Sequence, residues 1–176
     1  MTNEVGSDYL WNKRHSILYR IELSILYHQK RERFFDVWEK SAKAVAIIGG
    51  SAALANLAGS VGIKAIAALI TVTSTIALVF GLSDRSKRHA ELARNFRQLE
   101  AEIIQCGERE FSESDINTWE SKERELETAE PPALSDLVKL CQNEIAIASG
   151  HTEMVVPIPM GRRLLAHFIS FSPRNA

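Results

Sequence analysis

The sequence predicts an all-α integral membrane protein in which a two-helix transmembrane hairpin is joined to a cytosolic helical bundle. Three observations predict this class. Residues 44–83 form a block of 40 residues with one charged side chain. The segments on both sides of the block place apolar residues at the three- and four-residue spacing of helices. Basic residues are concentrated on both flanks of the block.

Length, charge and cysteine usage exclude several classes of protein. The chain has 176 residues, enough for one domain with an appended segment. Its net charge of −1 excludes a generally basic nucleic-acid binder, so we expect no specific binding to duplex DNA. Cys106 and Cys141 form no CxxC pair, which favours reduced thiols over a zinc site or a disulfide framework.

Residues 1–43 are expected to form an amino-terminal cytosolic helix. Residues 9–40 contain neither Gly nor Pro, and they carry apolar side chains on two sides. Ile17 and Ile21 lie on one side, and Leu23 and Tyr27 lie on the other. We therefore expect this helix to be sandwiched between neighbours. No uninterrupted apolar stretch of a signal peptide precedes the block, so its first span is expected to act as the insertion signal.

The apolar block divides into two spans, because a transmembrane helix needs about 20 apolar residues. We expect spans at about residues 44–63 and 65–82, with a turn in residues 59–64 and Lys64 at the far membrane surface. The alternative is an Ala-rich hairpin buried in a soluble bundle. Asn56, together with the low content of large apolar residues in the first span, keeps this alternative open.

The flanking charges predict the topology. Five basic residues lie shortly before the block and five follow it, whereas one lies between the spans. The positive-inside rule then places both termini in the cytoplasm of a multi-pass protein of the inner membrane. The two basic flanks comprise Lys30, Arg31, Arg33, Lys40 and Lys43, and then Arg85, Lys87, Arg88, Arg94 and Arg97.

Residues 84–150 are expected to form further cytosolic helices. The first has a seam in which apolar residues and one histidine recur at alternating three- and four-residue steps. Gly107 is the expected stop, and Ser112 with Asp115 resembles a capping box that opens the next helix. A helix after Pro131-Pro132 should end near Gly150. The seam consists of His89, Leu92, Phe96, Leu99 and Ile103.

Residues 151–176 change in character again. Residues 155–159 (VVPIP) must be extended, because each proline disfavours helix at the preceding residue. The following residues, 161–171, predict a short amphipathic helix. Core packing and a position in the membrane interface beside Arg162 and Arg163 are both compatible with this pattern.

The sequence lacks the motifs of common enzymes. It has no HExxH or GxSxG motif, and no G-K-[ST] follows the glycines of the apolar block. Its five histidines do not occur at the spacing of metal ligands. We therefore expect no catalytic residues, no bound metal and no cofactor.

The apolar block carries small and polar residues on one face of each span. Small residues allow membrane helices to approach closely, and hydroxyl or amide groups can bond across the contact. The same residues could instead line a narrow wet path, which requires a homo-oligomer, such as a tetramer, because one hairpin encloses nothing. These candidates for helix packing or pore lining are Gly49, Ala53, Asn56, Ser60, Thr71, Ser74 and Thr75.

The order of these segments resembles a known family. A long helix, YLWNKRHSILYRIELSILYHQKRERFFDVWEKSAKA, enters the hairpin at AVAIIGGSAALANLAG. SDRSKRHAELARNFRQLEAEI, an acidic segment and IPMGRRLLAHFISF then follow. This layout is similar to that of the SLATT family, the two-transmembrane effectors associated with the nucleotide-signalling (SMODS and SLOG) defence systems of prokaryotes. The resemblance covers nearly the whole chain and rests on layout, without an invariant motif.

The resemblance implies an antiphage effector that forms a pore or ion channel and depolarises the inner membrane. It further implies control by a nucleotide or oligonucleotide signal from a cognate nucleotidyltransferase. The alternative is a non-conducting membrane anchor or adaptor that recruits a protein partner through its cytosolic helices. Phosphates are bound by Arg and Lys, so the basic clusters are candidates for binding either the signal or lipid headgroups. These candidates are Arg85, Lys87, Arg88, Arg94, Arg97, Arg162 and Arg163.

Overall fold

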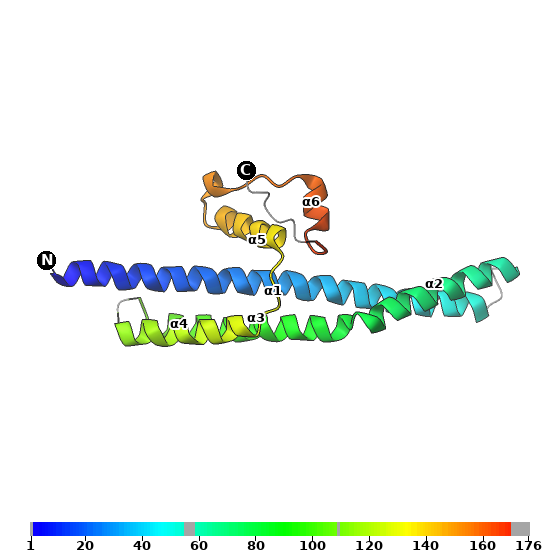
Figure 1. The fold of residues 1–176 in the computed structure, drawn as a ribbon, viewed down its shortest axis with the longest axis horizontal. Helices are drawn as coiled ribbons and strands as arrows, with labels where there is room; N and C mark the ends of the chain where they lie inside the picture. Colours follow the sequence, from blue (N-terminus) through cyan, green and yellow to red (C-terminus); the bar gives the residue numbers. More distant parts are fainter. Residues whose placement is uncertain (1, 55–58, 109, 170–176) are drawn as a thin grey trace. The chain divides into compact units, whose positions relative to one another are not determined.

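The computed structural model describes residues 2–54, 59–108 and 110–169, and in this part of the chain every regular element is a helix (Figure 1). The predicted all-α class is therefore confirmed. Most of the helices agree with the expected segments, and the differences lie around the apolar block and in the tail. The elements are α1 (Thr2–Leu54), α2 (Gly59–Val79), α3 (Leu82–Gln105), α4 (Glu113–Thr128), α5 (Ser135–Ala148), the 3₁₀ helix η1 (Thr152–Met154) and α6 (Met160–Leu165).

The chain divides into two compact units. Unit 1 comprises Met1–Gln29 and Ala90–Ala176, and unit 2 comprises Lys30–His89. Helices α1 and α3 contribute residues to both units. The apolar block, residues 44–83, lies wholly within the residue range of unit 2.

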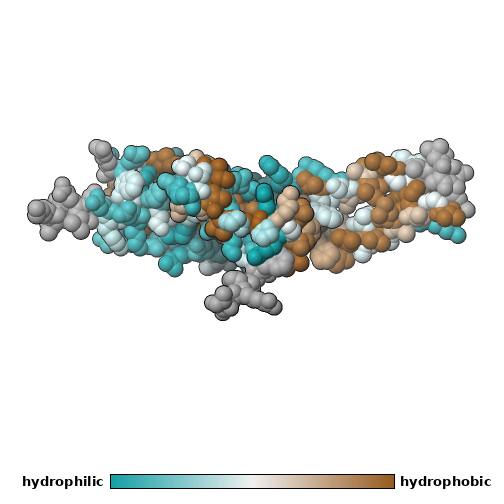
Figure 2. Space-filling view, turned by 90° about the horizontal axis from the view of Figure 1, so that it is seen from above, coloured by the Kyte–Doolittle hydropathy of each residue, from teal (hydrophilic) through white to brown (hydrophobic). Residues whose placement is uncertain are grey.

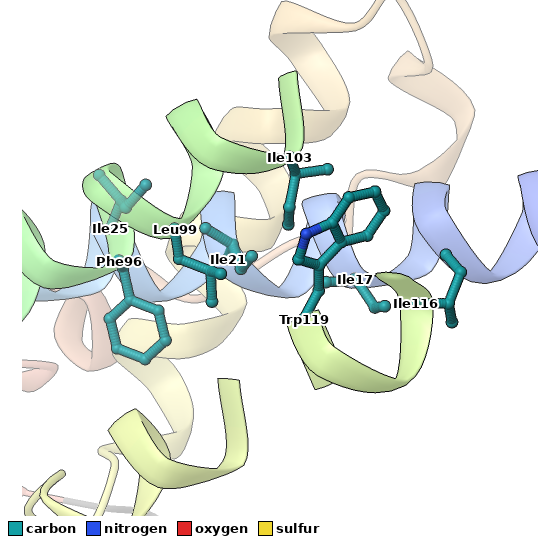
Figure 3. Close-up of a cluster of buried hydrophobic side chains, with 8 residues drawn as sticks. All are labelled: Ile17, Ile21, Ile25, Phe96, Leu99, Ile103, Ile116 and Trp119. Atoms are coloured by element: carbon teal, nitrogen blue, oxygen red, sulfur yellow. The ribbon is translucent and has the colours of Figure 1, made fainter. Parts of the chain in front are cut away.

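Unit 1 is built around a core shared by α1, α3 and α4 (Figure 3). Spacing of three or four residues places these side chains on one face of each helix, so that each face packs against the other two helices. Trp119 and Phe96 are the largest buried members, with exposed fractions of 2% and 0%. The core residues are Ile17, Ile21, Ile25, Phe96, Leu99, Ile103, Ile116 and Trp119.

The opposite side of α1 carries a second, smaller core. Tyr27 packs with Leu137 and Cys141 of α5 and with Ala166, which follows α6. The backbone N–H of Leu134 donates to the Tyr27 hydroxyl over 3.1 Å and holds the start of α5 against α1. The prediction that the first helix is sandwiched by neighbours is confirmed.

Polar residues join α1 to α4 at the edge of the first core. Arg20 donates from Nε and Nη2 to the two carboxylate oxygens of Glu123, over 2.7 and 2.6 Å. Glu123 is 2% exposed, so its charge is matched inside the unit. The hydrogen bonds from Arg20 to Glu123 raise the pKa of Arg20 above its ordinary value, which keeps the guanidinium charged.

The ends of α3 and α4 follow the predicted signals. Gly107, just beyond α3, has φ +75°, a conformation that favours glycine. At the start of α4, the Ser112 hydroxyl accepts from the Asp115 N–H while the Asp115 carboxylate accepts from the Ser112 N–H. The predicted capping box is therefore confirmed.

The boundaries expected for the second span were wrong. Helix α2 begins at Gly59, so the turn expected in residues 59–64 is helical, and Lys64 lies within the helix. The apolar run continues through Val61 and Ile63, and a membrane helix tolerates glycine at its start. At the other end α2 stops at Val79, Gly81 has φ +55°, and Leu82 already begins α3.

Residues 155–159 are extended, as expected, and the tail helix is shorter than predicted. Helix α6 covers only Met160–Leu165, compared with the expected residues 161–171. Proline at positions 157 and 159 disfavours helix before Met160. Helix α5 ends at Ala148, and Gly150 follows with φ +79°, in agreement with the expected stop.

Candidate functional site: the apolar arms and the basic clusters

Helix α2 is the strongest candidate for contact with a membrane. Val61–Val79 is long and apolar enough to cross a bilayer, and no residue of this stretch is buried. It is the one such helix found among the described residues, so two spans are not established. Figure 2 shows the part of the surface that contains α2 as largely hydrophobic. Val61 and Leu78 are 80% and 84% exposed, which is unusual for large aliphatic side chains.

One stripe of α2 is less exposed than the rest. Ile66, Ile70, Thr73 and Ala77 are half-buried, and they follow each other at steps of four, three and four residues. This is the spacing of a seam between two packed helices. The less exposed face of α2 therefore combines two isoleucines with Thr73 and Ala77, and it does not include the predicted Thr71, Ser74 and Thr75.

Gly49 of α1 provides the close approach to this seam. A Cβ atom at Gly49 would lie 2.9 Å from Ile66 Cγ2 and 2.9 Å from Ile70 Cδ1, closer than such atoms can pack. Gly50, the next residue, would have no atom within 4 Å of an added Cβ. Among the predicted packing residues whose surroundings the structure describes, Gly49 is the one that it brings to a helix–helix contact.

The three hydroxyl-bearing residues of α2 that the sequence analysis predicted for packing or pore lining lie off this seam. Thr71, Ser74 and Thr75 are exposed, so they do not pack against α1. Thr71 Oγ1 donates to the carbonyl of Ala67 over 2.8 Å, which satisfies its hydroxyl within the helix. These three residues form a hydroxyl face that is available to lipid, water or another copy of the chain.

Three of the predicted candidates cannot be assigned to a face. Asn56 lies outside the described residues. Ala53 belongs to α1 and Ser60 to α2, but their side chains are also outside the described part. Their assignment to packing or pore lining remains a prediction.

The basic residues that precede the apolar block are largely paired. Lys40 donates to Asp36 over 2.8 Å, and Lys43 donates to Glu39 over 2.6 Å, both at the i,i+4 spacing. The hydrogen bond from Lys43 lowers the pKa of Glu39, and the bond to Asp36 raises the pKa of Lys40. This flank therefore carries less net positive charge than its lysines suggest.

The basic residues after the block are more exposed. Arg85 donates from Nε to the carbonyl of Phe80 over 2.9 Å and so satisfies a carbonyl at the end of α2. Lys87 and Arg88 are exposed in unit 2. In unit 1, Arg94 is exposed, and Arg97 lies 3.1 Å from Glu100.

The two predicted arginines of the tail, Arg162 and Arg163, have different roles. Arg162 forms two hydrogen bonds with Asp136 of α5, whose side chain is 1% exposed. Arg163 is exposed. Arg162 therefore has a structural role within unit 1, and Arg163 is the tail arginine that is accessible to a ligand or a headgroup.

Sequence reasoning missed an aromatic cluster at the start of unit 2. The guanidinium of Arg31 lies 4.5 Å from the centre of the Phe35 ring and 5.6 Å from that of Phe34. Phe35 also stacks on His89, and Trp38 is 46% exposed nearby in the sequence. The interleaving of aromatic and basic residues in RERFFDVW was the available signal, because such residues are typical of membrane boundaries.

Within the described ranges, no group of three or more His, Cys, Asp and Glu residues could hold a metal ion. The chain was compared with protein-family models, with curated proteins and with solved structures. Nothing matches it. The interpretation of function therefore depends on the geometry of the chain and on the resemblance of its layout.

Proposed function

We propose that the chain is a membrane effector whose helical hairpin assembles with further copies into a pore in the inner membrane. The observation that carries this proposal is the surface of α2, where an apolar stretch long enough to span a bilayer has no buried residue. In a soluble bundle such a helix would form the core. An unburied apolar helix instead suits lipid or another copy of α2.

The apolar end of α1 is proposed to cross together with α2. The close contact at Gly49 with Ile66 and Ile70 supports a packed pair of helices. The basic residues before this end and after α2 support a common cytoplasmic side. Trp38, which is 46% exposed, is then proposed to lie at the membrane boundary.

The hydroxyl face of α2, made of Thr71, Ser74 and Thr75, is the proposed lining. It is exposed and lies off the seam with α1. In a homo-oligomer such as a tetramer, this face of each copy would be directed toward a common axis. Hydroxyls that bond within their own helix can enter a membrane at low cost and still attract water.

Control by a nucleotide-type signal is supported by the family resemblance. The exposed Arg88 and Arg94 offer cationic groups for phosphates. Helices α1 and α3 contribute to both units, so a ligand that favours one arrangement of these helices would bias the pore. The proposed outcome is depolarisation of an infected cell, without catalysis by this chain.

Ion flux through liposomes that contain the full chain tests the proposal. Ser74→Leu and Thr75→Val should reduce flux, because they make the proposed lining drier. Thr73→Val is the matched control, since it removes a hydroxyl from the half-buried seam, where Thr73 bonds to the carbonyl of Leu69. Flux should remain close to that of the unmodified chain in this control. Equal flux in all variants would exclude the hydroxyl face as the lining.

Absence of flux from an inserted and assembled chain would favour the non-conducting anchor or adaptor. The signal is tested in the same liposomes with nucleotides extracted from cells that contain the cognate nucleotidyltransferase. Arg88→Gln combined with Arg94→Gln should uncouple flux from these nucleotides and leave insertion unchanged. A response equal to that of the unmodified chain would exclude these arginines as the ligand site.

A further inference from the structure

The tail of unit 1 is held against α5 by polar side chains. Asn143 of α5 donates from Nδ2 to the carbonyl of Val156 over 2.7 Å and accepts from the Val156 N–H over 2.9 Å. Further along, Arg162 binds the buried carboxylate of Asp136 over 2.9 and 2.6 Å. Ala166 is the one tail residue that enters the second core of the described part.

The large apolar side chains of the tail are left on the outside. Met160 and Leu164 are each 71% exposed, and Phe168 is 55% exposed. A surface helix of a soluble protein ordinarily buries its apolar residues and exposes its arginines. Here Arg162 points inward and the apolar side chains lie outside. The large exposed apolar residues of this segment are Met154, Val156, Met160, Leu164, Leu165, Phe168 and Ile169.

The same segment is free of negative charge. The chain contains 22 acidic residues, but residues 154–176 contain none. Because Arg162 is paired with Asp136, Arg163 is the exposed cation of the described tail. Figure 2, which views the molecule from the side of α5 and α6, shows hydrophobic surface among hydrophilic surface there.

These features fit the surface of an anionic bilayer better than a protein. The exposed large side chains are aliphatic or aromatic, the exposed charge beside them is the cation of Arg163, and no acidic residue occurs in residues 154–176 to repel an anionic surface. Apolar side chains beside a cation suit the boundary between acyl chains and anionic headgroups. A chain anchored by α2 would also stay near the bilayer, so a short segment could bind where a free one could not.

We propose that the exposed face of the tail, formed by Met160, Leu164 and Phe168 with Arg163, inserts into the interface of an anionic phospholipid bilayer. The high local concentration of lipid in this proposal rests on the proposed membrane function. Arg162 is a positioning residue, since its ion pair with Asp136 fixes which face of α6 is directed outward. The tail then gives unit 1 its own contact with lipid.

Fluorescence quenching by spin-labelled lipids tests this proposal on the full chain in nanodiscs. The background is Cys106→Ser with Cys141→Ala, and a single cysteine carrying an environment-sensitive dye is placed at Leu164→Cys. Headgroup-level spin labels should quench this probe, more strongly with phosphatidylglycerol present than with phosphatidylcholine alone. Ser121→Cys on the acidic α4 is the matched control, exposed in the same unit, and should not be quenched.

A third probe, Val79→Cys, reports insertion of the hairpin separately, because Val79 is 71% exposed at the end of α2 and lies off both the seam and the hydroxyl face. Quenching at Val79→Cys without quenching at Leu164→Cys would overturn the tail proposal and leave the hairpin in the membrane. Quenching at Leu164→Cys alone would support the tail contact and count against insertion of α2. A blue-shifted but unquenched dye at Leu164→Cys would mean that protein covers the face, and would also overturn the proposal.

Variants that remove a positive charge provide a second test of lipid binding and leave the apolar face of the tail unchanged. Arg163→Gln should lower the ratio of lipid-bound to free tail about fivefold in anionic nanodiscs, the factor for about 1 kcal/mol per cationic side chain. Arg124→Gln is the control, because Arg124 is exposed on α4 of the same unit. Equal losses in the two variants would overturn a specific role for Arg163.

Discussion

Arg162 and Asp136 form a two-bond ion pair, with Nε to Oδ2 at 2.9 Å and Nη2 to Oδ1 at 2.6 Å, which joins α6 to α5. The carboxylate is 1% exposed and the guanidinium is 38% exposed. Loss of the arginine would therefore leave a buried negative charge without its partner.

We predict that Arg162→Leu lowers the free energy of unfolding by about 3 kcal/mol. Asp136→Leu combined with Arg162→Leu should recover most of this loss, because apolar residues can replace a buried pair at little cost. Denaturant unfolding in mild detergent, followed by circular dichroism, gives both values. A double variant as unstable as Arg162→Leu would contradict this account of the pair.

The contact between α1 and α2 at Gly49 should not tolerate even one added methyl group. Gly49→Ala brings a methyl group against Ile66 and Ile70, and the branched Ile66 methyl is held stiffly by its helix, so the two helices must separate. We expect weaker assembly of the full chain in detergent, measured by analytical ultracentrifugation. Gly50→Ala is the matched control, and equal weakening by both variants would show that the contact is not responsible.

Labelling with an impermeant maleimide should distinguish the two sides of the membrane. In a chain without Cys106 and Cys141, Ser60→Cys should be labelled in intact spheroplasts, and Ser121→Cys should be labelled only after lysis. The expectation follows from the basic residues on the two flanks of the apolar block. Labelling of Ser121→Cys in intact spheroplasts would contradict the predicted topology.

Because of the capping box, the stability of the start of α4 should depend on pH. The Ser112 side chain, and then the Ser112 backbone N–H, hold the pKa of Asp115 below its ordinary value of 3.8. A carboxylate whose pKa is lowered in the folded state stabilises that state at pH values above its ordinary pKa. This contribution to stability is lost as the pH falls through the lowered pKa. Asp115→Asn should thus lower Tm at pH 6, and the difference from the unmodified chain should shrink below about pH 4.

The control for this prediction is Glu125→Gln, which removes an exposed carboxylate of α4 that is outside the first turn. Its Tm difference from the unmodified chain should not change in the same way. A Tm difference for Asp115→Asn that is constant from pH 3 to pH 6 would contradict the role of the ionised carboxylate.

Trp119 should contribute more to the free energy of unfolding than Trp11, one of the two exposed tryptophans of α1. Trp119→Ala removes a side chain that is 2% exposed, and we expect a loss of about 3–5 kcal/mol. Trp11 is 51% exposed and stacks on His15, so Trp11→Ala should cost less than about 1 kcal/mol. Equal losses would mean that the core of unit 1 is not organised around Trp119.

Helix type and the buried faces were predictable because they depend on local spacing. The four-residue steps from Ile17 to Ile25 and the seam through Phe96 and Ile103 were sufficient to find the core of unit 1. The capping box and the glycine stop at Gly107 were equally local signals. Each could be recognised from a few neighbouring residues.

The remaining features depend on partners that are distant in sequence. No residue next to Arg20 in the sequence indicates that Glu123 is its partner. Likewise, no residue next to Arg162 indicates that it forms an ion pair with Asp136. The seam of α2 was missed because helical projection groups small and polar residues but does not show which face meets α1. The start of α2 was misplaced because glycines and a lysine indicate a turn in water, whereas they are compatible with a helix beside an apolar partner.

The core of unit 1 also has a consequence for the order of events during synthesis. Ile17, Ile21 and Ile25 pack against residues of α3 and α4 that leave the ribosome only after the whole apolar block has been made. While translation continues, the amino-terminal helix must keep this apolar face uncovered. Closure of the bundle therefore follows synthesis of the whole apolar block, and a chain stalled before Trp119 would present an incomplete core to chaperones and proteases.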